Sequence, residues 1–135
     1  MTYTVGDIVA ERSLHITRDS LVKYAGASGD FNPIHYRDDI AQSVGLPGVL
    51  AHGMLTMGIA VGTIISALGD SGRIREYGVR FTRPVVVDAR NGADIDITAK
   101  VASITDEAIR IDLTVVFDGK AVLGKAQVFV TPETA

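Results

Sequence analysis

The chain contains no cysteine among its 135 residues. This absence excludes disulfide bonds, thiolate nucleophiles and cysteine-ligated zinc. The chain is slightly acidic, with 13 Lys and Arg against 16 Asp and Glu and a formal net charge of −3. Its basic residues are scattered and form no long basic run. Direct binding of nucleic acid needs a concentrated positive surface, so the composition argues against it.

The sequence also lacks the marks of export. No basic N-terminal region precedes an apolar run, so we expect no signal peptide and a cytoplasmic protein. Residues 49–68 contain no Asp, Glu, Lys or Arg and reach about 20 residues, the length of a membrane span. However, His52, Thr56 and Thr63 interrupt the run, and amphipathic patterns follow it directly. We therefore expect a buried helix in a soluble fold and no membrane span.

With 47% hydrophobic residues, the chain predicts one globular domain over residues 1–135. A first strand ends at residue 16, and Thr17 is expected to cap a helix that runs to Ala25. A short helix is predicted over residues 38–44, ending at Gly45. The long apolar helix is predicted over residues 52–68.

After this helix the pattern changes to strict alternation of apolar and polar side chains, which predicts antiparallel strands. The alternating segments are residues 77–81, 95–101 and 109–115. Asp118-Gly119 predicts a two-residue hairpin loop, and the implied partners are apolar or small. The expected pairs are Val115 with Val122, Leu113 with Gly124, Ile111 with Ala126, and Ile109 with Val128.

These patterns favour an α+β fold, a single hot-dog domain in which a curved antiparallel sheet wraps a long apolar central helix. A generic two-layer α+β domain, with its helices stacked at one edge, is the alternative.

Residues 28–35 (SGDFNPIH) give the clearest functional signal. Proline fixes its own φ and restricts the residue before it, so the Asn32-Pro33 step makes a stiff bend. Asp30 and His35 flank this bend, and a carboxylate with an imidazole can move protons near neutral pH. Singly, Asp30 and Asn32 suit a turn and His35 suits a structural role. Together on a fixed bend they predict an acid–base site.

His52-Gly53 is a second candidate, at the start of the long helix. Free N–H groups and the positive end of the helix dipole favour negative charge there, so the Gly53 N–H is a candidate oxyanion donor. We expect His52 to cap the helix, and we expect His15, in a strand pattern, to take no part. The three histidines have no repeated ligand spacing, so no metal site is predicted.

Residues 24–35 (YAGASGDFNPIH), followed by Ala41, resemble the hydratase 2 motif of the MaoC-like (R)-specific enoyl thioester hydratases. The similarity continues through residues 51–54 (AHGM) and 80–85 (RFTRPV), and so covers most of the domain. With residues 46–48 (LPG) and 51–58 (AHGMLTMG), the chain looks especially similar to the catalytic B-type subunit of actinobacterial 3-hydroxyacyl-ACP dehydratases.

The resemblance implies a hot-dog fold and a lyase of fatty-acid metabolism. The reaction is reversible syn hydration of a trans-2-enoyl thioester, on CoA or ACP, to the (3R)-3-hydroxyacyl thioester, without cofactor or metal. It assigns Asp30 and His35 as the acid–base pair, Asn32 as a support for water or the loop, and Gly53 as the donor to the thioester carbonyl.

Three further residues are candidate substrate contacts. Ser28 lies within the motif, Arg80 could meet carrier phosphates or only be an exposed strand residue, and Gly58 could leave room for an acyl chain. Close packing of helix on sheet explains Gly58 equally well.

Two other functions stay open. Hot-dog domains also host thioesterases, which would release a free thiol from an acyl thioester. A non-catalytic acyl-binding or partner subunit of a heteromeric dehydratase is the second, and loss of Asp30 or His35 would have favoured it. The resemblance implies a homodimer, or a heterodimer with a related hot-dog subunit. The sequence does not specify the carrier, the acyl chain length, the partner or the physiological direction.

Overall fold

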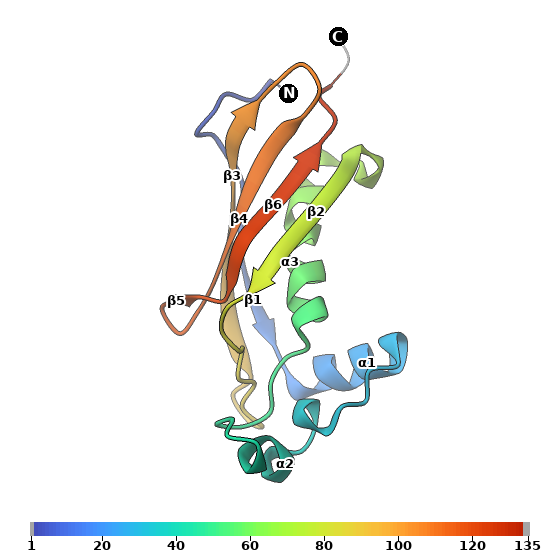
Figure 1. Cartoon of the computed structure of the whole chain (residues 1–135), viewed down its shortest axis with the longest axis vertical. Coiled ribbons are helices and arrows are strands. Elements are labelled where there is room, and N and C mark those ends of the chain that lie inside the picture. The colour runs from blue at the N-terminus through green and yellow to red at the C-terminus, as the bar shows by residue number, and fades with distance from the viewer. Residues whose placement is uncertain (1, 134–135) are drawn as a thin grey trace.

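The computed structural model describes residues 2–133. A curved antiparallel sheet lies along the helix α3, and two short helices cluster at one end of the molecule (Figure 1). The elements are β1 (Ile8–Ile16), α1 (Arg18–Ser28), η1 (Pro33–His35), α2 (Asp38–Ser43), α3 (Gly53–Leu68), η2 (Ser71–Arg73), β2 (Ile74–Phe81), β3 (Ala93–Ile104), β4 (Ile109–Phe117), β5 (Lys120–Ala121) and β6 (Leu123–Val130). The sheet order is β1-β3-β4-β6-β2, with β5 paired to β4.

The alternating segments form the strands that the sequence predicts. Along β3 and β4 nearly every second side chain is buried, and these side chains form a large part of the core. The buried members are Ala93, Ile95, Ile97, Ala99, Val101, Ile109, Ile111, Leu113 and Val115. Thr17 caps α1 as predicted, because its side chain accepts a hydrogen bond from the Ser20 N–H.

The hairpin loop at Asp118-Gly119 is confirmed, with both residues at positive φ and Phe117 paired to Lys120. The predicted register further along is wrong by two residues. The pairs are Ile109↔Val130, Arg110↔Phe129, Ile111↔Val128 and Asp112↔Gln127. The chain leaves the ladder between β5 and β6, and Lys125 takes a φ of 43°, which is typical of a bulge. Because the shift is even, the same side chains still face the core.

The sheet covers α3 on one side only. Ala60, Thr63 and Ile64 are buried, whereas Met54 is 59% exposed. A Cβ added at Gly58 or Gly62 would meet no atom within 4 Å, so these glycines do not provide the close contact with the sheet. Ala60 and Thr63 lie at that contact instead. With 16 residues, α3 is shorter than a membrane span, and no helix within residues 2–133 is long and apolar enough to cross a membrane.

A charged contact holds the loop before α3 against the two short helices. The Asp38 carboxylate accepts hydrogen bonds from Arg18 Nη2 at 2.9 Å and from the Val49 N–H at 3.0 Å. Arg18 Nε donates in turn to the Val87 carbonyl. The Val49 N–H and then the Arg18 guanidinium hold the pKa of Asp38 below its ordinary value of 3.8. This contact fixes residues 48–50, which lead into the site described below.

We expect Asp38→Ala to lower the free energy of unfolding by about 1 kcal/mol near neutral pH, mostly because the Val49 N–H loses its acceptor. The ion pair adds little, since the Asp38 side chain is 47% exposed and solvent screens it. A carboxyl with a lowered folded pKa stabilises the fold above its unfolded pKa and loses that effect as the pH falls through the folded value. Urea unfolding should therefore show the wild-type advantage near neutral pH and its loss well below pH 3.8. An equal difference at both pH values would contradict the assignment.

Candidate active site

The bend that carries Asp30 is held by side chains bonded to the local backbone. Helix α1 ends at Gly29, whose φ of 77° turns the chain. Ser28 Oγ accepts from the Asp30 N–H at 3.1 Å, and Asp30 Oδ1 accepts from the Asn32 N–H at 3.2 Å. Asn32 Oδ1 accepts from the Ile34 N–H at 3.2 Å and so caps η1. Ser28 and Asn32 therefore support the loop, which presents the Asp30 carboxylate, with a side chain 50% exposed.

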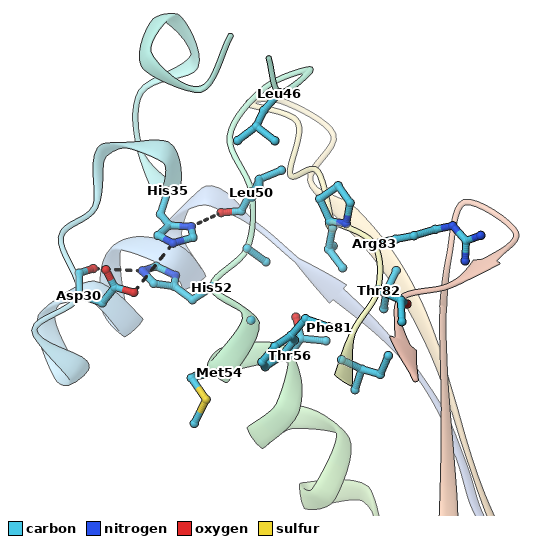
Figure 2. A pocket seen from close by; sticks show the side chains of 16 residues that line it. Asp30, His35, Leu46, Leu50, His52, Met54, Thr56, Phe81, Thr82 and Arg83 are labelled. Carbon is cyan, nitrogen blue, oxygen red and sulfur yellow. Dashed lines mark hydrogen bonds and ion pairs between the residues drawn. The ribbon is translucent and has the colours of Figure 1, made fainter. Parts of the chain in front are cut away.

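His35 is buried and its ring orientation is fixed from one side. Its Nδ1 lies 2.8 Å from the Leu50 carbonyl oxygen. A carbonyl only accepts, so Nδ1 carries the proton and Nε2 has a lone pair when the ring is neutral. Nε2 lies 3.9 Å from Asp30 Oδ2, longer than a hydrogen bond. Asp30 and His35 therefore face a common point at which a small molecule can bind both (Figure 2).

Gly53 is the first residue of α3, and its N–H belongs to the group that has no acceptor inside the helix. A Cβ added here would lie 2.9 Å from Phe81 Cε1, so the phenyl ring occupies the space that any larger side chain would need. The Gly53 N–H thus lies at the positive end of the helix dipole, and a residue other than glycine would require Phe81 to move.

Asp30, His35 and Gly53 line one cavity of about 540 Å³. Most of the remaining wall is apolar and includes Leu46, Met54 and Phe81 (Figure 2). The structure therefore brings the predicted acid–base pair and the predicted oxyanion donor to a single, mostly apolar pocket.

Several sequence-predicted residues lie outside this pocket. The described residues that line the pocket do not include Ser28, Asn32, Gly58 or Arg80. Substrate contact by Ser28, Gly58 and Arg80 therefore stays a prediction. Arg83 does line the pocket, although one of its guanidinium nitrogens donates to the Ala121 carbonyl at 3.0 Å. In the sequence, Arg83 belongs to the same segment, residues 80–85, as Arg80. The alternation of apolar and polar residues does not show which of these two arginines faces the pocket.

His52 takes a role that the sequence did not indicate. It occupies the N-cap position of α3, yet its side chain makes no capping hydrogen bond, so the expectation that it caps the helix is wrong. Its ring instead stacks on His35, with centroids 3.9 Å apart and planes at 21°. Burial lowers the pKa of His52; the hydrogen bond to the Asp30 carbonyl opposes this in part, and the nearby His35 lowers the pKa further. The residue is 1% exposed, and this burial favours the neutral ring.

Asp30, His35 and His52 bring possible ligand atoms within 4.8 Å of one another. A metal ion needs imidazole lone pairs that converge on one point about 2.0–2.1 Å from each nitrogen. The lone pair of an imidazole nitrogen lies in the plane of its ring. Because the rings of His35 and His52 are stacked and nearly parallel, their lone pairs point in parallel planes and do not converge on one ion. His52 Nε2 is also 3.2 Å from the Asp30 carbonyl oxygen, to which its N–H donates a hydrogen bond. These residues fit a metal poorly, and a metal-free site remains our prediction.

The fold is a hot-dog domain, and it places the carboxylate of Asp30 and the imidazole of His35 beside the N-terminus of α3. The chain matches the family described as "MaoC like domain" over residues 4–116. The protein therefore belongs to the MaoC-like domain family.

Relatives support this assignment. The (R)-specific enoyl-CoA hydratase of Rhodospirillum rubrum is 31% identical over 117 residues, which cover 85% of this chain and 80% of that protein. The 3-hydroxyacyl-thioester dehydratase X of Mycobacterium tuberculosis is 39% identical over 79 residues, or 58% of this chain, and the match spans only 27% of that protein.

Solved structures agree on the fold. A structure titled MaoC-like dehydratase has a TM-score of 0.93 at 38% identity. The match covers 97% of this chain and 41% of the chain in that structure. The R-hydratase PhaJ1 from Pseudomonas aeruginosa has a TM-score of 0.81 at 28% identity, with 98% and 84% coverage. The hot-dog fold expected from the sequence is thus confirmed.

Proposed function

We propose that the protein catalyses reversible hydration of a trans-2-enoyl thioester to the (3R)-3-hydroxyacyl thioester. One observation carries the proposal: Asp30 Oδ2 and His35 Nε2 face each other at 3.9 Å in the cavity that Gly53 also lines. The names of its relatives, an enoyl-CoA hydratase and a hydroxyacyl-thioester dehydratase, support the same chemistry.

The geometry allows each step of this reaction. A water bound between Asp30 and His35 gives up a proton to the pair as its oxygen bonds to C3 of the enoyl group. Negative charge moves to the thioester oxygen, where the Gly53 N–H and the α3 dipole stabilise the enolate. The pair then returns a proton to C2, which restores its own charge state. Because one pair delivers both hydroxyl and proton from the same side of the substrate, syn addition follows.

We further propose that a second hot-dog unit, identical or related, completes the protein. Strand β2 is an edge of the sheet, and residues 2–133 supply no strand on its outer side. Phe81 at the end of β2 is 55% exposed and Met54 at the cavity is 59% exposed. A free edge beside exposed apolar side chains is typical of a surface that another chain covers. The mass of the purified protein in solution tests this, and a monomer would contradict it.

A cytoplasmic location stays a prediction.

The test of function is a spectroscopic assay with crotonyl-CoA and with crotonyl-ACP. We expect the enoyl absorbance to fall while no free thiol is released, and the rate to be unchanged after dialysis against EDTA. Thiol release without loss of the enoyl group would indicate the thioesterase. No reaction on either carrier, at any enoyl chain length, would contradict the proposal and favour a binding subunit. Loss of activity with EDTA, restored by a divalent metal, would overturn the metal-free site.

A further inference from the structure

The imidazole of His52 contacts both residues of the predicted acid–base pair, through the ring of His35 and the backbone carbonyl of Asp30, and it lines the same cavity. One face stacks on His35 at 3.9 Å between centroids, and Tyr24 of α1 meets the ring edge-on at 4.7 Å. Nε2 lies 3.2 Å from the Asp30 carbonyl oxygen (Figure 2). The next residue along the chain is Gly53. His52 thus joins the loop of Asp30, the ring of His35 and the first N–H of α3.

The proton positions on His52 follow from its partners. The Asp30 carbonyl can only accept, so Nε2 carries the hydrogen. Nδ1 is buried without a hydrogen-bond partner among the described residues. A proton on Nδ1 would place a buried, unsatisfied charge against His35, whereas a bare Nδ1 leaves only an unused lone pair. The neutral ring with hydrogen on Nε2 is therefore the state that this environment stabilises.

We propose that His52 is a positioning residue that acts as a neutral spacer. Its Nε2–H holds the backbone of Asp30, and its ring face holds the His35 ring at a fixed height above the start of α3. The two contacts together set the distance between the acid–base pair and the oxyanion donor Gly53. The expected changes in rate rest on the proposed hydration. The neutral state of His52 does not, because it follows from the contacts of the ring in the fold.

A matched pair of substitutions separates the two contacts. His52→Phe keeps a flat ring against His35 but has no donor for the Asp30 carbonyl, whereas His52→Gln keeps a donor and loses the ring. Small misplacements of catalytic groups cost up to about 10²-fold in rate. We expect kcat to fall about 10- to 100-fold in His52→Phe and less in His52→Gln, with KM changed less than about 3-fold in both. His15→Gln, at an exposed histidine paired with Asp94, is the control and should leave both constants unchanged.

The protonation state is tested separately, by ring ¹⁵N NMR of the protein, which has only three histidines. At about pH 6.5, the ordinary pKa of histidine, one set of signals should have the values of a mostly neutral Nε2-protonated ring and be missing from both His52 variants. If these signals have the values of a doubly protonated ring at this pH, the proposal is overturned. Wild-type kcat in both variants, or a rise in KM without loss of kcat, would also overturn it.

These outcomes distinguish this inference from the proposed function. An inactive wild-type protein with a neutral His52 rejects the hydration but keeps the assigned state of the ring. If His52→Phe does not fold, the kinetics of His52→Gln and the ¹⁵N NMR spectrum of the wild-type protein still test the proposal.

Discussion

Asp30→Asn is expected to lower the rate of crotonyl-CoA hydration about 10²- to 10⁴-fold, the range for loss of a general acid or base. Asparagine has the shape of aspartate, but its amide cannot take a proton from water. Its oxygen can still accept from the Asn32 N–H, the bond that Asp30 Oδ1 accepts at 3.2 Å. The backbone carbonyl that binds His52 is also retained. The substitution therefore removes the proton acceptor and leaves the bend in place.

The comparison needs a carboxylate that is chemically similar and outside the pocket. Asp39 of α2 is such a residue, since its carboxylate pairs with Arg37 at 2.6 Å on the surface. Asp39→Asn should keep wild-type kcat, and both variants should unfold at the same temperature as the wild type to within a few degrees, about the shift from 1 kcal/mol or less. A hydration rate near wild type in Asp30→Asn would remove Asp30 from the mechanism.

Local patterns were sufficient to predict the elements and the motif loop. Alternation along β3 and β4 is set by burial of one sheet face, so the predicted strands and their buried residues agree with the structure. The bend at Asn32-Pro33 depends on dihedral restrictions and on side chains bonded two residues away, both of which are encoded locally. For the same reason the loop at Asp118-Gly119 was predictable.

Features that depend on tertiary contacts were not predictable from these patterns. The bulge at Lys125, which accompanies the altered register of β6, has no sequence signal as strong as the hairpin loop. Helical periodicity placed Gly58 on α3 but did not show that it faces away from the sheet. His52 was expected to cap its helix because it stands at the right position. Its actual partners, Asp30 and His35, lie 22 and 17 residues earlier and meet it only in the fold.

His35 should be tested with two variants, because its two ring nitrogens make separate contacts. Its Nδ1–H anchors the ring to the Leu50 carbonyl at 2.8 Å, while Nε2 faces Asp30. His35→Asn retains an amide N–H near the position of Nδ1 and removes Nε2, whereas His35→Ala removes both. We expect each to lower kcat about 10²- to 10⁴-fold, since neither can exchange a proton with water in the pocket.

The two variants should differ in stability. His35→Ala leaves the Leu50 carbonyl without its donor and opens a cavity beside His52, so the free energy of unfolding should fall by about 1–3 kcal/mol. His35→Asn should lose less, because its amide can still donate to Leu50. Urea unfolding at neutral pH measures this difference, and the hydration assay measures the rates. Equal loss of activity with unequal loss of stability would assign catalysis to Nε2 and loop anchoring to Nδ1. Recovery of activity in His35→Asn alone would mean that the anchor is what catalysis requires, and Nε2 would lose its assigned role.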